Sequence, residues 1–193
     1  MYRVRKALNH NTLIAISMEN NQEYLVIGKG IGFGKKVSER FEIPENIECS
    51  VYSLHEQTER GKAMDLIKGI EPVYLEIAGK VLAKSEEVFG KIDKRILFPM
   101  ADHIAFAVQR IRANEQISNP LTDDIRALFH MEYKTAECVK DILWEMLQVE
   151  IDEHEIGYIA LHIHSAIEDE NVALSMQIAM AVRECIRMIE EET

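Results

Sequence analysis

The chain has 193 residues, of which 47% are hydrophobic, and a formal net charge of −11 at pH 7. A chain of this length can bury one good core or two modest ones, which indicates a globular protein with one main domain and room for a smaller one. No apolar run approaches the ~18–20 residues that cross a bilayer, and the start of the chain lacks the apolar core of a signal peptide, so we expect a cytoplasmic protein without membrane insertion.

The charge is unevenly distributed along the chain. The first 40 residues hold seven basic residues against three acidic ones, a local balance of +4, and most acidic residues lie downstream. The overall acidity argues against nucleic-acid binding by the whole surface. A short basic module ahead of a larger acidic one instead indicates a nucleic-acid footprint confined to the first part of the chain.

Residues 2–54 have the pattern of β-strands. Residues 12–18 and 23–27 are rich in β-branched and apolar side chains and are bounded by polar turn clusters, and residues 47–54 alternate between apolar and polar side chains. We therefore predict a small antiparallel sheet with residues 47–54 as its fourth strand. About fifty residues of strand bury too little apolar surface to be stable alone, so one face should pack either on a second copy of the sheet or on the helical part.

The connection between the third and fourth predicted strands contains four glycines at alternate positions, basic residues and one aromatic residue, Phe33. No Gly-Lys-Ser/Thr ending and no helix follow, so a nucleotide-triphosphate loop is not expected. Basic side chains around one aromatic ring suit a surface that neutralises phosphates and stacks on a base. For this segment alone, a flexible glycine-rich turn with solvated lysines is an equally good interpretation.

From residue 57 onward the apolar pattern changes from alternation to helical period. Residues 57–64 are polar and predict a linker or a first helical turn, and Pro99 should either kink its helix or mark the beginning of that helix. Short connections between the first five helices predict a compact antiparallel bundle, whereas the last helix has no obvious partner within the chain. The predicted helices span residues 72–89, 93–112, 121–129, 133–147, 152–167 and 172–189.

Two of these helices carry a histidine at a comparable position. His103 follows Asp102 and lies seven residues before Arg110, which returns to nearly the same angular position, and the helix with His162 repeats the arrangement. A partly buried structural histidine is the default interpretation of either residue alone. A neutral imidazole is also a competent nucleophile near neutral pH if Asp102, Arg110 or a group from another helix holds its second nitrogen. His164 lies ~200° around the helix from His162 and is predicted to be structural.

These motifs resemble those of the BglG-type transcriptional antiterminators. Asn9-His10-Asn11 followed by the glycine-rich segment is similar to their co-antiterminator RNA-binding domain. The helical motifs are similar to the first of the two regulation domains through which the sugar phosphotransferase system controls these proteins; they lie at residues 102–104, 109–110, 119–120, 132–133 and 159–163. The similarity runs from about residue 2 to the end of the chain, and the glycine-rich segment is closest to the glucose-type antiterminators.

The resemblance implies an α+β multidomain chain in which a small antiparallel β-sheet RNA-binding domain precedes an all-α helical bundle. The first domain would span residues 1–56, and the first regulation domain, a five-helix bundle, would span residues 65–170. Residues 171–193 resemble the first helix of a second regulation domain. Members of the family continue into that second domain, so we expect the chain to be a truncated form.

The resemblance also implies roles for individual residues. The phosphoryl acceptors would be His103 and His162. The implied partners are an RNA hairpin that overlaps a terminator, an enzyme II of the phosphotransferase system, the phosphocarrier protein HPr and a second copy of the chain. By resemblance, a sugar-specific transporter subunit phosphorylates the first regulation domain when its sugar is absent, and the protein then fails to hold the dimer that grips RNA. The implied RNA-binding residues are Lys6, Asn9, Asn11, Gly28, Lys29, Phe33 and Lys35, with Lys6 and Lys35 as phosphate contacts.

Three departures from the family pattern bear on these roles. Lys29 stands where many members have arginine, which replaces a bidentate donor with a point charge and affects which hairpin is recognised. His10 replaces a third asparagine, and Met100-Ala101 precede Asp102 where Leu-Thr is common.

Two other classes of protein fit parts of the sequence. An enzyme with Asp102 and His103 as an acid–base pair would need a nucleophile, a metal site or a cofactor fingerprint, and the sequence shows none of these. The three cysteines, Cys49, Cys138 and Cys185, form no Cys-x-x-Cys pair. We therefore expect no enzyme activity, catalytic residue, cofactor or metal. The remaining alternative is a structural or interaction module without RNA affinity.

Overall fold

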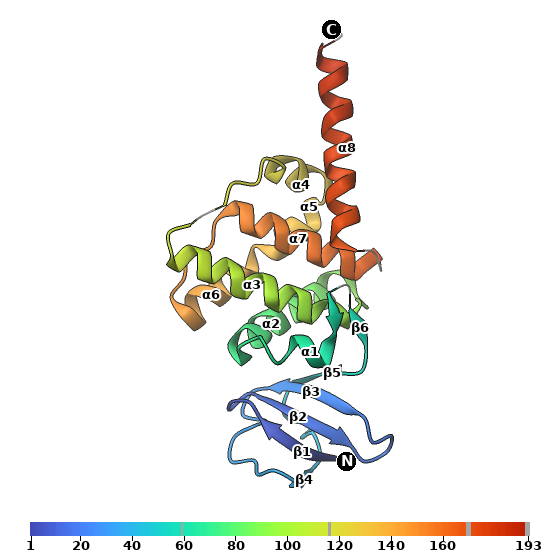
Figure 1. Cartoon of the computed structure of the whole chain (residues 1–193), viewed down its shortest axis with the longest axis vertical. Coiled ribbons are helices and arrows are strands. Elements are labelled where there is room, and N and C mark those ends of the chain that lie inside the picture. Colours follow the sequence, from blue (N-terminus) through green and yellow to red (C-terminus); the bar gives the residue numbers. More distant parts are fainter. Residues whose placement is uncertain (59, 116, 169–170, 192–193) are drawn as a thin grey trace.

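The computed structural model describes residues 1–58, 60–115, 117–168 and 171–191. A small antiparallel sheet at one end of the molecule is followed by a helical bundle, from which the last helix projects on the opposite side (Figure 1). This arrangement confirms the predicted α+β architecture, with a sheet domain ahead of an all-α domain.

The main sheet has five strands in the order β4-β1-β2-β3-β5. The strands β2 and β3 form the predicted hairpin, in which Thr12 lies opposite Ile27. The strand β5 lies within the predicted fourth strand. The sequence does not predict β4, because two residues are too short to show an alternating pattern. The strands are β1 (Tyr2–Ala7), β2 (Thr12–Ser17), β3 (Glu23–Gly28), β4 (Arg40–Phe41) and β5 (Cys49–Ser53).

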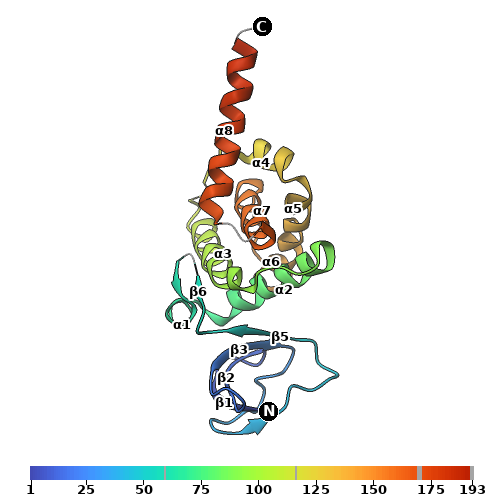
Figure 2. The same cartoon turned by 90° about the vertical axis from the view of Figure 1, so that its right-hand side faces the viewer.

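The two faces of this sheet are buried by different parts of the chain. On one face, Leu13 packs with Ile31 and Phe41, which come from the segment between β3 and β5. On the other face, Leu25 and Tyr52 join the core of the helical domain, and the helix α2 (Pro72–Phe89) lies across that face (Figure 2). The sequence predicts that one face of the sheet packs on a second copy of the sheet or on the helical part. In the single chain this face packs on the helical part.

The described residues of the predicted linker, 57–58 and 60–64, form a short hairpin and a helical turn. The strands β6 (Gln57–Thr58) and β7 (Gly61–Lys62) pair antiparallel, and the single-turn helix α1 (Ala63–Leu66) follows directly. The Thr58 hydroxyl donates a hydrogen bond of 2.7 Å to the Gly61 carbonyl and so closes the turn. The polar composition of residues 57–64 does not predict this hairpin, since each strand is only two residues long.

The bundle largely follows the predicted helices. The helix α3 begins two residues before Pro99, so this proline marks the start of the helix, where its missing N–H costs no helical hydrogen bond. The predicted helix over residues 133–147 is wrong as a single element, because the chain turns at Glu137 and the Lys140 N–H bonds to the Glu137 carbonyl. The elements are η1, a 3-10 turn (Lys94–Ile96), α3 (Leu97–Arg112), α4 (Thr122–Leu128), α5 (His130–Ala136), α6 (Cys138–Leu147) and α7 (Glu153–Glu168).

The last helix, α8 (Val172–Glu191), is half packed and half projecting. In its first half, Ser175 and Ala179 are fully buried, and the Arg183 guanidinium donates a hydrogen bond of 2.6 Å to the Pro120 carbonyl. The expectation that this helix lacks a partner within the chain is therefore wrong for its first half. The second half extends away from the bundle (Figure 1). Across the described ranges of the chain, no helix is both long and apolar enough to cross a membrane.

Candidate RNA-binding surface and histidine pair

The turn between β1 and β2 lies against the glycine-rich segment. The Asn9 side-chain oxygen accepts a hydrogen bond of 2.9 Å from the Asn11 backbone N–H, which closes the turn locally. The Asn11 side-chain oxygen accepts a hydrogen bond of 2.8 Å from the Gly30 backbone N–H. Two segments that the sequence assigns to one surface are therefore joined directly.

The glycine-rich segment is held in a defined shape. The backbone of Gly30 has φ +74°, a conformation that glycine adopts without strain. A Cβ atom on Gly32 would lie 2.2 Å from the Asn9 carbonyl oxygen, so only glycine fits where the two segments cross. Ile31 is buried beneath the segment, whereas the Phe33 ring is 70% exposed and meets the His10 ring edge-on at 5.3 Å. The structure thus favours a rigid presentation of Phe33 over a flexible turn.

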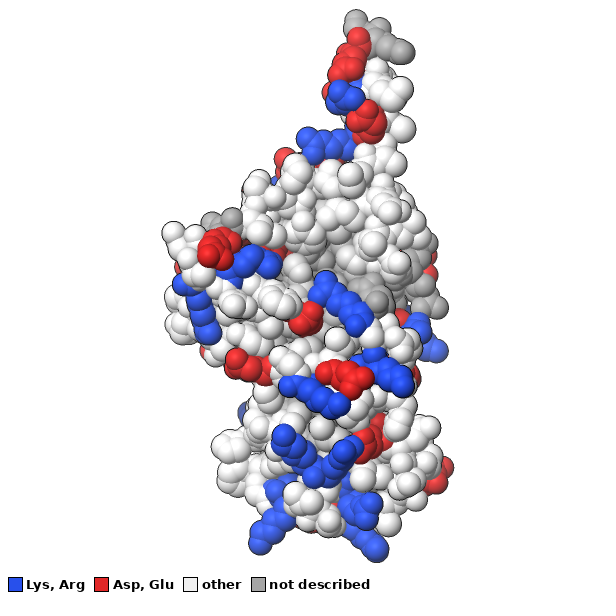
Figure 3. All heavy atoms as spheres, in the orientation of Figure 1, with Lys and Arg blue, Asp and Glu red and all other residues white. Residues whose placement is uncertain are grey.

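Basic side chains gather on the sheet domain (Figure 3). Among the predicted RNA contacts, Lys6 and Lys29 are exposed. Lys35 differs, because its ammonium lies 2.6 Å from a Glu39 carboxylate oxygen and 5.3 Å from the centre of the Phe41 ring. Part of the charge of Lys35 is therefore already compensated within the chain.

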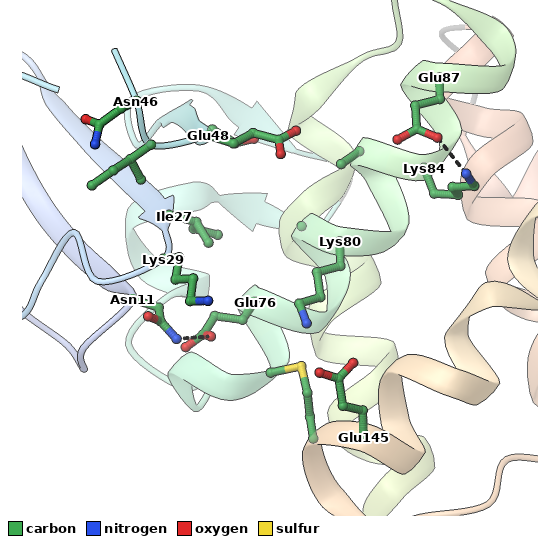
Figure 4. A pocket seen from close by; sticks show the side chains of 16 residues that line it. Asn11, Ile27, Lys29, Asn46, Glu48, Glu76, Lys80, Lys84, Glu87 and Glu145 are labelled. Atoms are coloured by element: carbon green, nitrogen blue, oxygen red, sulfur yellow. Dashed lines mark hydrogen bonds and ion pairs between the residues drawn. The ribbon is translucent and has the colours of Figure 1, made fainter. Parts of the chain in front are cut away.

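The turn also carries a contact that the sequence does not predict. The Asn9 side-chain amide donates a hydrogen bond of 2.5 Å to one Glu76 carboxylate oxygen, and the Asn11 amide donates one of 3.0 Å to the other. Glu76 lies on α2 and is buried at the edge of a cleft of about 800 Å³ between the sheet and the helices, beside Lys29 and Lys80 (Figure 4). No local pattern reveals this contact, because Glu76 is 65 residues from Asn11.

The helical domain brings the two predicted acceptor histidines together. His103 on α3 and His162 on α7 have ring centroids 5.5 Å apart, and the Tyr158 ring lies 5.4 Å from that of His103. The side chain of His103 is 12% exposed, whereas His162 is 2% exposed. His103 is therefore the more accessible member of the pair.

A buried carboxylate, that of Glu155 on α7, organises this pair. The Arg110 guanidinium donates hydrogen bonds of 3.1 and 2.6 Å from Nε and Nη2 to Glu155 Oε1. The other oxygen, Oε2, lies 3.1 Å from His103 Nε2, outside the angular range of a hydrogen bond. Burial acts to raise the pKa of Glu155, but the neighbouring His103 and Arg110 outweigh it and lower that pKa below its usual value.

Glu155 is a group from another helix that faces His103, and the sequence leaves open whether such a group orients the imidazole. The sequence contains a signal for Glu155, since this residue precedes His162 by seven residues, the spacing that separates His103 from Arg110. The charged residue and the histidine on α7 therefore face the histidine and the charged residue on α3. Asp102, the nearer carboxylate in sequence, instead pairs at 2.6 Å with Arg60 from the turn between β6 and β7.

The environment of His162 favours the neutral imidazole. Burial lowers the pKa of His162 well below 6.5, and the neighbouring His103 and Arg60 act in the same direction. Its Nδ1 atom is buried without a hydrogen-bond partner. A neutral ring with a free nitrogen has the electronic state of a nucleophile.

His164 lies on a different side of α7, as predicted. Its Nδ1 atom is 2.9 Å from a Glu132 carboxylate oxygen, and its ring is 4.3 Å from that of Phe129. It takes no part in the histidine pair. Among the residues that the structure describes, no group of three His, Cys, Asp or Glu side chains is placed to hold a metal ion.

Both domains match known families. The sheet domain matches the CAT RNA binding domain over residues 2–60, and the helical domain matches the PRD domain over residues 80–166. The fold and these matches define the class, a regulator in which an RNA-binding sheet domain precedes a helical regulation domain.

Related proteins narrow the class further. The chain is 34% identical to the protein GlcT of Staphylococcus haemolyticus over 192 residues, which covers 99% of the chain and 66% of that relative, and 32% identical to GlcT of Staphylococcus epidermidis, of which it covers 67%. It also aligns with the crystal structure of GlcT CAT-PRDI at 31% identity and a TM-score of 0.72, over 86% of this chain and 98% of that one. The chain therefore belongs to the BglG-type transcriptional antiterminator family and is similar to its glucose-type members. It spans about two thirds of the length of these curated relatives.

Proposed function

We propose that the chain acts as a cytoplasmic transcriptional antiterminator that binds an RNA hairpin overlapping a terminator and has no enzyme activity. The observation that carries this proposal is the junction of the Asn9–Asn11 turn with the glycine-rich segment, which presents Phe33 to solvent beside exposed Lys29. An exposed aromatic ring next to lysines suits an unpaired base flanked by phosphates. Asn9, Asn11, Gly28, Lys29 and Phe33 then contact the RNA, with Lys6 and Lys35 at phosphates.

The regulatory half of the proposal assigns phosphoryl transfer to the histidine pair. A phosphorylated donor, an enzyme II of the sugar phosphotransferase system or HPr, gives its phosphoryl group to an imidazole nitrogen of His103 or His162. The new group carries about −1.5 to −2 charges at pH 7, so it repels the Glu155 carboxylate and attracts the guanidinium of Arg110. The accessible ring of His103 accepts first, since His162 needs a local opening.

Coupling to RNA runs through the connection between the domains. Arg60 of this connection pairs with Asp102, which neighbours His103 in sequence. A phosphoryl group on His103 competes with Asp102 for this guanidinium and changes how the sheet domain is held. A homodimer held by the sheet domains is the RNA-binding form, and phosphorylation weakens it.

The test measures RNA affinity of the full chain by fluorescence anisotropy with a bulged RNA hairpin. Phe33→Ala should weaken binding by about 1–3 kcal/mol through loss of one base stack. Phe106→Ala, which removes another exposed phenylalanine ring from α3, should leave affinity unchanged. Absence of RNA affinity in the parent chain would favour the interaction-module alternative.

The regulatory half has its own test. His103→Asp adds part of the phosphoryl charge and should weaken both RNA binding and dimerisation, whereas His103→Ala should keep both. RNA affinity and analytical ultracentrifugation report the two effects. Equal behaviour of the Asp and Ala variants would refute a charge-driven switch, and tighter RNA binding by the Asp variant would reverse its sign.

A further inference from the structure

Several polar groups of the proposed RNA-binding turn make hydrogen bonds within the chain. The side-chain amides of Asn9 and Asn11 both donate to Glu76, and the Thr12 hydroxyl lies 3.4 Å from the same carboxylate. The side-chain oxygens of both asparagines accept from backbone N–H groups of the turn and of Gly30. Each asparagine therefore commits one of its two side-chain N–H donors to Glu76 instead of an RNA base or phosphate.

The group that occupies these donors has the chemistry of the proposed ligand. A carboxylate presents two anionic oxygens, and a phosphate presents the same kind of acceptor. Glu76 is 7% exposed and lies beside Lys29 and Lys80, whose ammonium groups flank it across the cleft (Figure 4). The site therefore surrounds Glu76 with amide donors and two lysines, as an RNA-binding surface would surround a phosphate.

The helix carrying Glu76 is seated closely on the sheet. Gly79, one turn after Glu76, has no side chain, and a Cβ atom there would lie 3.5 Å from Ile27 and 3.6 Å from the Tyr52 hydroxyl. This close approach brings the Glu76 carboxylate within reach of the turn. While α2 stays in this position, the Glu76 carboxylate holds one N–H donor of each asparagine, although both residues are partly exposed.

We propose that this contact is autoinhibitory, and that Glu76 of α2 closes the RNA-binding turn by occupying the place of an RNA acceptor. The structure is then the closed form of the chain, and RNA binding requires α2 to leave the turn. The inference rests on the proposed function, since it takes Asn9 and Asn11 as RNA contacts. The cleft beside the contact is lined by charged side chains such as Glu48 and Lys80 together with apolar ones such as Ile27.

The expected change in RNA affinity follows from the fraction of molecules in the open form, in which α2 has left the turn. The apparent dissociation constant equals the intrinsic one divided by the open fraction, so a closed form holding about nine tenths of the molecules weakens binding about tenfold. Removing the Glu76 carboxylate frees the donors and should recover most of that factor.

The experiment compares variants of the full chain in fluorescence anisotropy with a synthetic bulged RNA hairpin. Glu76→Ala should raise RNA affinity about five- to tenfold. Glu87→Ala is the matched control, because Glu87 lies on the same helix and lines the same cleft but pairs with Lys84 at 2.6 Å. It removes the same charge without touching the turn and should change affinity less than twofold, the part due to long-range electrostatics.

Two further variants, Phe33→Ala and Glu76→Gln, distinguish a failure of the closed-form proposal from a failure of the proposed function. Phe33→Ala should weaken binding both alone and combined with Glu76→Ala, because the stacking contact does not depend on closure. Unchanged or weaker binding by both Glu76→Ala and Glu76→Gln, with circular dichroism showing folded protein and with Phe33→Ala still weakening binding, would overturn the closed form and leave the proposed function standing. Equal gains from Glu76→Ala and Glu87→Ala would overturn it too, because charge alone would explain them. No RNA binding by any variant would overturn both proposals.

Discussion

Replacing the buried carboxylate of Glu155 tests the construction of the histidine site. Glu155→Gln keeps the shape of the side chain but removes the charge that holds Arg110 and faces His103. The Glu155 side chain is 1% exposed, whereas that of Arg110 is 28% exposed and can turn toward solvent. Loss of charge-assisted hydrogen bonds costs about 1.5–3 kcal/mol, and breaking a fully buried pair costs about 3–5 kcal/mol. We expect the free energy of unfolding to fall by about 2–3 kcal/mol, since Arg110 recovers part of its hydration.

The loss of unfolding free energy caused by Glu155→Gln should become smaller as the pH falls. The pKa of Glu155 in the folded chain lies below its ordinary value of 4.5, so its stabilisation is complete above pH 4.5 and is lost as the pH falls through the folded value. The difference between the parent and Glu155→Gln should therefore be constant near neutral pH and shrink at acidic pH.

Urea unfolding followed by circular dichroism measures both quantities. The matched control is Glu153→Gln on the same helix, because Glu153 pairs with Arg126 at 2.6 Å with its side chain 57% exposed. Solvent screens an exposed pair, so its loss should lower the free energy of unfolding much less than the loss of the buried one. Equal losses in the two variants, or a Glu155→Gln difference that does not change with pH, would refute the buried-carboxylate argument.

Three further predictions concern single side chains. The pKa of His162 is lowered in the folded chain, so below pH 6.5 the unfolded chain binds a proton that the folded chain does not. The free energy of unfolding should therefore fall by about 1.4 kcal/mol per pH unit below pH 6.5. Urea titrations of His162→Gln should lack this contribution. Lys29→Ala should reduce the salt dependence of RNA binding by about one unit of slope, whereas Lys35→Ala should reduce it less because of its internal ion pair; equal slopes would contradict this difference. Gly32→Ala should lower the free energy of unfolding by about 1–3 kcal/mol, because its Cβ atom would meet the Asn9 carbonyl oxygen, and an unchanged thermal melting temperature would disprove that steric argument.

Local patterns in the sequence determine most of the elements. The alternation in β2 and β3 and the helical period of α2 place these elements at or near their observed bounds, because each pattern reports which side chains one element must bury. The patterns fail where an element is very short or where two helices join. The strand β4 and the hairpin of β6 and β7 are too short to show a period, and the turn at Glu137 leaves the apolar stripe of residues 133–147 unbroken.

The candidate site likewise has residues that local motifs indicate and contacts that no local pattern reveals. Local motifs in the sequence indicate Phe33, His103 and His162 as candidate residues, and the resemblance to the antiterminator family adds Asn11. The sequence does not show that the two histidine rings lie 5.5 Å apart, or that Glu76 reaches the Asn9–Asn11 turn.

Only the tertiary structure decides which groups face one another across elements. A periodic pattern fixes which face of a helix is buried, but it carries no information about the element that covers that face. Glu76 and Asn11 are 65 residues apart, Glu155 and Arg110 are 45 apart, and Arg60 and Asp102 are 42 apart. These contacts form because packing of α2 on the sheet and of α7 on α3 buries apolar side chains, and the polar groups carried into those interfaces must then find partners there.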